Sequence, residues 1–350
     1  MTMTVWEREE FRSLCRDFFA QQAGVDRLRR YLNRPAPNFD QELWDQLVEL
    51  GVVQAALPNV EVGEQAGVQD LAVAVEEAGR ALQCAPLAST LSSARVLSRY
   101  GFLAEHPEVR KALDDGAVAT FPHDLGQAEA DPVGEVRALL VPDPGPGAIL
   151  LVPVERRDGT GLGVTVIDGP RCRQRSTIDL VRSFSDVTVP PDAWVGFIEN
   201  PAAAHELLHT AVTLQAAESL GAASTAFQLT LDYAKERRQF DRAIGSFQAI
   251  KHRLADMYVE LQCAQVTVAA AAEALDSGKD VAACAHTAKS VTGRAASWIT
   301  SQAQQVHGGI GFTWEHELHL YIRRTKANEL LLGSPAAHEV SLVAALSAQS

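Results

Sequence analysis

The sequence predicts a mostly α-helical protein with a small β domain in the middle of the chain. Residues 5–115 and 201–350 carry apolar side chains at helical spacing, whereas residues 116–200 alternate short apolar runs with Pro- and Gly-rich turns. The 350 residues are enough for two or three units with sizeable cores. We therefore expect an N-terminal helical domain (1–115), a middle β domain (116–200) and a C-terminal helical bundle (201–350).

Composition and charge narrow the class of protein. Apolar residues make up 47% of the chain and charged residues 21%, as in ordinary soluble proteins. The net charge of −13 argues against binding to nucleic acid or to an anionic membrane surface. We expect no signal peptide and no membrane-spanning run. The five cysteines are far apart and lack metal-ligand spacing, so we expect no metal, reduced thiols and a cytoplasmic location. The abundance of Ala and Arg is typical of a GC-rich bacterial gene.

Cap and stop signals divide the N-terminal region into helices. An apolar stripe from Trp6 to Phe19 predicts the first helix, and one from Leu43 to Val48 predicts the second. Asn38 or Asp40 is the expected N-cap of the second helix, Asp70 that of the third and Ser89 that of the fourth. Gly51 is the expected end of the second helix and Gly101 that of the fourth. In the middle region, apolar runs predict strands at 117–121, 138–141, 148–152, 164–167 and 185–189.

Four helical patterns joined by short loops predict an antiparallel bundle in the C-terminal region. They run over residues 203–238, 247–275, 281–305 and from the GGIG turn to about residue 332. Small residues on the first apolar stripe, among them Gly221 and Ala222, predict close packing against another helix.

A short arm, rich in arginine, connects the first two of these helices. It lies within residues 233–257, YAKERRQFDRAIGSFQAIKHRLADM, where Ser246 is the predicted N-cap of the next helix and Phe240 looks buried. Two arginines and an aromatic ring favour a grip on an anionic ligand that has a planar part. The alternative is an ordinary helix hairpin with solvated charges.

The segments ERRQFDRAIGSFQAIKHRLADM and QVHGGIGFTWEHELHLYIRRTK together resemble the acyl-CoA dehydrogenase family, most clearly over residues 205–335. The segments LGVVQAALP and EEAGRALQCAPL extend the resemblance to the N-terminal helical domain. It implies a middle domain that is β-barrel-like and an antiparallel four-helix bundle that forms the oligomer interface. It also implies FAD-dependent α,β-desaturation of an acyl-CoA thioester, with electron-transfer flavoprotein as a possible electron acceptor.

The residue that would act as the catalytic base is missing. Members of the family use a Glu at one of two places, which the resemblance puts at Ala211 and Leu332 in this chain. The nearby acids are weak alternatives. Glu218 lies two helical turns beyond Ala211, about 10 Å away, and is better interpreted as an interface or hydrogen-bonding residue. Glu329 precedes Leu332 by three residues and is better interpreted as a solvated helical Glu.

The cofactor contacts that the family lends to a neighbouring subunit are present. The resemblance assigns them to residues of the arm, the following helix and the GGIG turn: Arg237, Gln239, Phe240, Gln248, Gln305, Gly308 and Gly309. An Arg fork suits a diphosphate, and glycines let backbone N–H groups approach an anion. Taken alone, GGIG could equally be a helix C-cap. His307, inside the turn, is better interpreted as a packed or hydrogen-bonded residue.

The chain's own half of the FAD site is not recognisable. HDLGQAEADPVGEVRALL (residues 123–140) stands where the family carries a Thr-rich loop, and the Trp-x-Thr/Ser-Asn segment is absent. These features resemble the accessory, base-lacking subunit of bacterial α2β2 acyl-CoA dehydrogenases, some of which act on steroid side chains. The expected partner is a catalytic paralogue that shares its FAD. The alternatives are a self-sufficient homo-oligomer with a displaced Glu base and a non-enzymatic scaffold that binds acyl-CoA or a partner.

Overall fold

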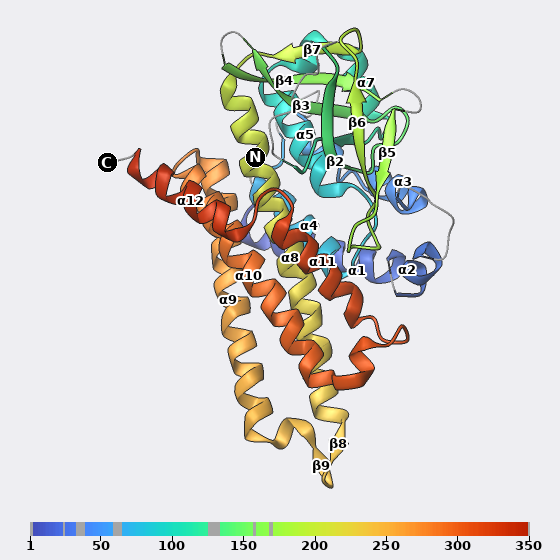
Figure 1. Ribbon diagram of the computed structural model, residues 1–350, viewed down its shortest axis with the longest axis vertical. Helices are drawn as coiled ribbons and strands as arrows, with labels where there is room; N and C mark the ends of the chain where they lie inside the picture. Colours follow the sequence, from blue (N-terminus) through green and yellow to red (C-terminus); the bar gives the residue numbers. More distant parts are fainter. Residues whose placement is uncertain are drawn as a thin grey trace.

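A computed structural model describes residues 3–23, 25–32, 39–58, 65–124, 134–156, 159–167 and 171–348. Helices from both ends of the chain flank a β domain, and three long helices extend away from it as a stalk (Figure 1). The predicted fold class, mostly α with a small β domain in the middle, is confirmed. Residues 125–133, which belong to the segment 123–140 that stands where the family carries a Thr-rich loop, lie outside the described residues.

The N-terminal region contains seven α-helices among its described residues. They are α1 (Val5–Gln22), α2 (Val25–Leu32), α3 (Gln41–Glu49), α4 (Val68–Arg80), α5 (Leu87–Arg99), α6 (Phe102–Glu105) and α7 (Pro107–Asp114), with a 3-10 turn at Gln54–Ala56. Of these helices, α4 and α5 are the most buried. As predicted, Asp40 caps α3, because its carboxylate accepts a hydrogen bond from the Leu43 N–H at 3.2 Å. Gly51 and Gly101 follow helix ends with φ of +80° and +78°, a conformation that glycine adopts without strain.

Two predicted N-caps in this region are wrong. Gly67 precedes α4, and Asp70 lies inside the helix, where it accepts from Arg8 Nε of α1 at 2.9 Å. Pro86 precedes α5, so Ser89 is also internal and donates to the Pro86 carbonyl. At α4 the start is set by a tertiary contact: the Asp276 carboxylate, from the far end of the chain, accepts from the first N–H groups of the helix.

The β domain contains two separate sheets. One has the order β1 (Ala119–Thr120), β3 (Ile149–Arg156), β4 (Gly159–Val166), β7 (Trp194–Ile198), with β1 parallel to β3. The other has the order β2 (Val136–Pro142), β6 (Phe184–Val189), β5 (Cys172–Arg175). Strand β5 escaped prediction because CRQR is polar and shows no apolar run. Strand β7 has the apolar sequence WVGFI and was overlooked although its pattern is readable.

The C-terminal region contains α8 (Pro201–Glu236), α9 (Gln248–Ser277), α10 (Val281–His307), α11 (Leu318–Leu330) and α12 (Pro335–Ser347). The strands β8 (Arg238–Gln239) and β9 (Arg242–Ala243) form a hairpin at the tip of the stalk (Figure 1). The fourth helix is shorter than expected, because the 3-10 turn Gly308–Phe312 and the turn over residues 313–317 delay its start to Leu318. Gly333 at φ +100° and Pro335 separate α11 from α12. Ser246 is not an N-cap either: Phe247 precedes α9, and the Ser246 hydroxyl donates to the Ala243 carbonyl at 2.7 Å.

Glycines bring α4 and α8 into close contact, as the small residues of the first stripe predicted. A Cβ atom added at Gly221 would overlap the Glu76 carbonyl oxygen, and one added at Gly79 would overlap that of Glu218. This contact joins the N-terminal helices to the stalk. All five cysteines are free thiols.

Among the described residues, one stretch, Leu318–Ser347, is long and apolar enough by composition to cross a membrane, with a mean hydropathy of 1.3. It is not one helix but two, since α11 and α12 are separated by the turn at Gly333.

Candidate functional site

The structure brings the predicted cofactor-binding residues to the far end of the stalk (Figure 1). They come from adjoining elements: Arg237 at the end of α8, Gln239 and Phe240 in the β8–β9 hairpin, Gln248 at the start of α9, Gln305 in the last turn of α10, and Gly308 and Gly309 in the 3-10 turn Gly308–Phe312. Gly308 is half-buried and the others are exposed. This end of the molecule therefore presents a set of hydrogen-bond donors to solvent.

The arm is a tight hairpin that points its aromatic residue outward. Phe240 is 85% exposed, so the prediction that it is buried is wrong. Phe240 and Asp241 both have positive φ, +51° and +62°, as a two-residue hairpin turn of this kind requires. Such φ values cost about 1 kcal/mol or more for a residue with a Cβ. A strained turn that displays an aromatic ring to water is a reason to look for a ligand or partner there.

Local contacts hold the arm in shape. Arg238 Nη2 donates to the Asp241 carbonyl at 2.7 Å, and the Ile244 N–H donates to the Arg237 carbonyl at 2.8 Å. The Arg242 guanidinium lies 4.0 Å over the Phe247 ring. The side chain of Arg237 remains exposed. The hairpin thus keeps its own cations engaged and leaves Arg237 available.

The GGIG turn is open to solvent on the side of its glycines. Gly308 has φ +64° and ψ −140°, which only glycine adopts readily. No atom lies within 4 Å of a Cβ built at Gly308 or Gly309, so there is free space beside this stretch of backbone. His307, the residue before the turn, is buried and donates from Nδ1 to the Ala303 carbonyl at 2.8 Å.

The two positions expected for a catalytic base are apolar and buried. Ala211 lies on α8 and Leu332 follows α11. The Leu332 N–H donates directly to the His123 carbonyl, just after β1, at 3.0 Å. Backbone of the bundle and backbone of the β domain are therefore in direct contact at this point.

Glu218 belongs to a buried ion cluster rather than to a cleft. Its carboxylate accepts from Arg324 at 2.9 Å, Arg182 at 3.1 Å and Asn328 at 2.8 Å. Burial by itself would raise the pKa of Glu218, but the two guanidinium groups lower it below its usual value. A carboxylate held by two cations in this way is a poor proton acceptor.

Arg324 is the centre of this cluster and is fully buried. Besides Glu218, it donates to Asp179 of the β domain at 2.6 Å and to the Gln83 carbonyl of the N-terminal domain at 3.2 Å. Burial would lower the pKa of Arg324, but the charges of Asp179 and Glu218 outweigh burial and raise it. One side chain of α11 thus ties all three parts of the chain together.

Lys289 bonds to a residue about one helical turn from each base position. Its Nζ donates to Gln215 Oε1 at 2.6 Å and to the Asn328 carbonyl. Gln215 lies one helical turn after Ala211, and Asn328 lies four residues before Leu332. Burial lowers the pKa of Lys289 to about 7. A buried amine therefore stands near the places where the family would put a carboxylate.

Glu329, the second weak alternative, is half-buried on α11. Its carboxylate accepts from Ser297 Oγ and from Lys326 Nζ, each at 2.6 Å. Burial would raise the pKa of Glu329, but these two hydrogen bonds lower it. Its carboxylate is thus engaged by α10 and by its own helix.

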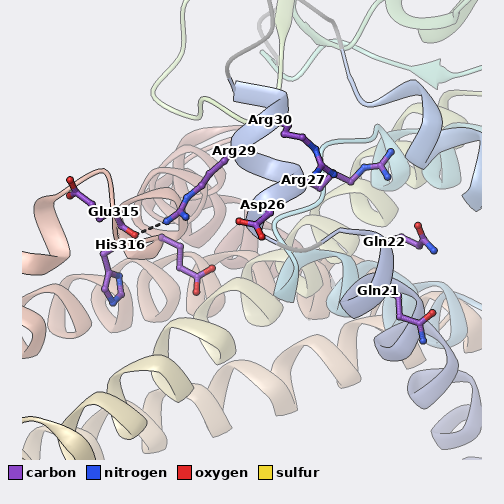
Figure 2. A pocket seen from close by; sticks show the side chains of 9 residues that line it. Gln21, Gln22, Asp26, Arg27, Arg29, Arg30, Glu315 and His316 are labelled. Atoms are coloured by element: carbon purple, nitrogen blue, oxygen red, sulfur yellow. Dashed lines mark hydrogen bonds between the residues drawn. The ribbon is translucent and has the colours of Figure 1, made fainter.

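A polar cleft of about 570 Å³ lies between α2 and the loop that precedes α11 (Figure 2). Arg29 spans it and donates to the Glu315 carbonyl at 2.6 Å. Arg27 is held by Asp40 with bonds of 2.6 and 2.7 Å. Because the lining balances arginines with the carboxylates of Asp26, Glu315 and Glu317, the cleft has no net attraction for an anion.

Comparisons with known proteins agree with these features. Residues 6–105 match the acyl-CoA dehydrogenase N-terminal domain and residues 202–345 match the acyl-CoA dehydrogenase C-terminal domain. The acyl-CoA dehydrogenase IpdE2 of Mycobacterium tuberculosis is 34% identical over 333 residues, which cover 94% of each chain. The chain belongs to the acyl-CoA dehydrogenase family. IpdE2 of Mycolicibacterium smegmatis is 30% identical over 94% of this chain and 95% of its own.

Solved acyl-CoA dehydrogenases share the whole fold. The "Tcur3481-Tcur3483 steroid ACAD G363A variant" superimposes with a TM-score of 0.85 at 28% identity and covers 98% of both chains. The "ChsE4-ChsE5 complex from Mycobacterium tuberculosis" gives 0.80 at 23% identity and covers 99% of this chain and 98% of that one. The second likeness is one of fold alone.

The residues at the end of the stalk carry exposed groups of the kind that bind a diphosphate or another anion. Acyl-CoA dehydrogenases bind FAD, which supplies the hydride acceptor for oxidation of a CH–CH bond. Arg237 can pair with a diphosphate, and the uncovered backbone of Gly308 and Gly309 can approach an anion. Gln239, Gln248 and Gln305 add exposed amides. The middle-domain loop that would hold the chain's own flavin includes residues 125–133, outside the described residues, so its predicted loss stays a prediction.

The buried cluster of this dehydrogenase was not predicted. Arg324 was visible in the RRTK motif, and Lys289 stands out as the only charge in the stretch AACAHTAKSVTG. A single cation among apolar residues is the sequence signal that could have identified Lys289 as a buried charge. Its partners, Gln215 and Asn328, are distant in sequence and could not have been assigned.

Proposed function

We propose that this chain is the accessory subunit of a heteromeric acyl-CoA dehydrogenase and lends FAD contacts to a catalytic paralogue. The observation that carries the proposal is the hydrogen bond of 3.0 Å between the Leu332 N–H and the His123 carbonyl. A catalytic base must face the α carbon of the thioester across a space that holds substrate and flavin. At Leu332 the bundle and the β domain are already in contact.

The chemistry of the interior supports the same conclusion. Ala211 and Leu332 cannot accept a proton, and Glu218 is neutralised by Arg182 and Arg324. In contrast to these buried positions, the proposed cofactor-binding residues Arg237 and Phe240 are exposed to solvent. A subunit with a closed interior and an open cofactor surface is suited to complete another subunit's site.

The relatives suggest the partner and the substrate class. The steroid ACAD variant is named for two components, Tcur3481 and Tcur3483, and a second solved relative is a complex of ChsE4 with ChsE5. By analogy, the partner is a paralogous acyl-CoA dehydrogenase that carries the Glu base, in an α2β2 assembly. The substrate is a bulky acyl-CoA such as a steroid-derived thioester, oxidised in the cytoplasm with electron-transfer flavoprotein as acceptor.

Co-expression with a paralogous acyl-CoA dehydrogenase that carries the Glu base tests the proposal. The chain purified alone should be colourless, whereas the complex should contain about one FAD per two subunits and be reduced by acyl-CoA. Full flavin occupancy of the chain alone would favour a self-sufficient enzyme. Absence of flavin from the complex would favour a scaffold. Either result would overturn the proposal.

The Arg237→Ala variant tests the lending of contacts directly. In the complex it should lower the FAD retained after gel filtration, because a charge-assisted contact to the diphosphate is lost. The matched control is Arg173→Ala, which removes an exposed arginine from β5 in the β domain. Equal FAD retention in the two variants would contradict the proposal.

A further inference from the structure

Three aromatic rings in contact join the root of the arm to the GGIG turn. The Tyr233 ring of α8 lies nearly parallel to the His307 ring of α10, with centroids 4.4 Å apart and planes at 19°. The His316 ring packs edge-on against the His307 ring, with centroids 4.7 Å apart. Tyr233 Oη also lies 3.5 Å from the His307 carbonyl. Arg237 follows Tyr233 by one helical turn, and Gly308 follows His307 directly.

Only one nitrogen of the buried His307 ring makes a hydrogen bond among the described residues, so packing against the neighbouring rings also holds the ring in place. Nδ1 donates to the Ala303 carbonyl at 2.8 Å, so the neutral ring carries its proton there and Nε2 is an acceptor. Nε2 is buried without a hydrogen-bond partner in the described part of the structure. The residue is 4% exposed. A buried, unpaired nitrogen is unfavourable, so an aromatic ring without that nitrogen should fill the place equally well.

We propose that His307 is a positioning residue that sets the spacing between the arm and the turn. The inference rests on the proposed lending of FAD contacts. Arg237 follows α8, whereas the Gly308–Gly309 backbone follows α10. One cofactor can contact both only if the distance between these two helix ends is fixed. The Tyr233–His307 stack fixes it, because each ring belongs to the last turn of its helix. His316 then anchors the end of the turn, where its Nδ1 accepts from the Leu318 N–H at 3.1 Å.

Flavin affinity of the co-expressed complex provides the test. The complex is stripped of FAD and titrated with FAD while flavin fluorescence is followed. The dissociation constant should rise about fivefold for His307→Ala and for Tyr233→Ala, within the roughly two- to twelvefold range for loss of one aromatic pair. The double variant should be no weaker than either single variant, because both remove the same contact. His307→Phe should restore the affinity to within about twofold of the wild type, since it keeps the ring.

His106→Ala is the matched control. His106 stacks on Phe102 at 4.1 Å in the N-terminal domain, so its loss removes a comparable pair far from the stalk. It should lower the melting temperature of the flavin-free complex without changing FAD affinity. The positioning role is refuted if His307→Phe binds FAD as weakly as His307→Ala, or if the two alanine effects add.

The Arg237→Ala variant separates this inference from the proposed function. If Arg237→Ala weakens FAD binding and His307→Ala does not, the arm contacts the cofactor but His307 does not position it. If neither variant changes FAD affinity, the lending of contacts fails and the positioning role fails with it.

Discussion

Arg324 neutralises two carboxylates that are buried away from solvent. Asp179 and Arg324 are both fully buried, and their contact at 2.6 Å is reinforced by Glu218 at 2.9 Å. Burying ions is unfavourable unless each is paired and hydrogen-bonded, so the cluster is weak evidence for a net gain in folding free energy. Its directional contacts do fix the relative positions of the segments that carry them. It specifies how α11 sits against α8 and the β domain.

Replacement of Arg324 by Ala should destabilise the chain by about 3–5 kcal/mol, because Asp179 and Glu218 would remain buried and each would lose one of its two guanidinium partners, with Arg182 left. Arg323→Ala is the control. Its side chain donates to the Ile178 carbonyl at 3.3 Å, and the change should cost less than about 1 kcal/mol. Urea unfolding of the two variants measures both values. Similar stabilities would mean that Arg324 is not the organising charge.

At the scale of elements, the contact between α4 and α8 depends on glycine. Gly79 and Gly221 lack the Cβ atoms that would otherwise separate the two backbones. Asp276, at the end of α9, accepts from the Val68 N–H at 2.6 Å and the Gln69 N–H at 3.1 Å, and so caps α4 from outside the domain. Both contacts attach the N-terminal helices to the stalk.

Gly221→Ala should destabilise the chain by about 3 kcal/mol or more, because the new methyl group would overlap the rigid backbone of α4. Gly293→Ala in α10 is the matched control. Its nearest neighbours lie at 3.5 Å or beyond, and alanine should stabilise that helix by up to about 1 kcal/mol. Opposite signs in urea denaturation are expected. A stable Gly221→Ala protein would show that the helices can separate without cost.

At the scale of the whole molecule, buried histidines make stability depend on pH. Burial lowers the pKa of His209 and of His338 to about 4 and that of His123 well below its usual value. Through these groups the unfolded chain binds more protons than the folded chain between about pH 4 and 6.5. Asp143, whose pKa burial raises to about 7, and Glu317 act in the opposite direction. The histidines are more numerous, so the net effect is destabilisation by acid.

The melting temperature should be highest near pH 7 and fall by several degrees as the pH decreases from about 6.5 towards 5. His338→Gln should flatten this dependence, because glutamine does not titrate but can still donate to the Leu332 carbonyl, which His338 Nε2 reaches at 2.8 Å. Differential scanning calorimetry across this range is the measurement. A wild-type melting temperature that rises towards acid would show that Asp143 and Glu317 dominate instead.

Much of the fold was predictable because it depends on local periodicity. The long helices α8, α9 and α10 extend over many turns, and their apolar stripes and closing residues are readable from sequence alone. The prediction was wrong where a contact with a residue distant in sequence, rather than a local residue, sets the start of a helix or stabilises a strand. The start of α4 is capped by Asp276 rather than by Asp70, and β5 is a polar strand stabilised by pairing with β6.

The sequence by itself determined the fold class, the family resemblance and the identity of the arm and turn residues, because these are properties of short contiguous motifs. Only the tertiary structure decided that Phe240 is exposed, that Leu332 meets His123, and that Glu218 is neutralised by Arg182 and Arg324. The last two facts join residues that are far apart in the chain. Burial and charge pairing between distant segments leave no mark on the local pattern of either one.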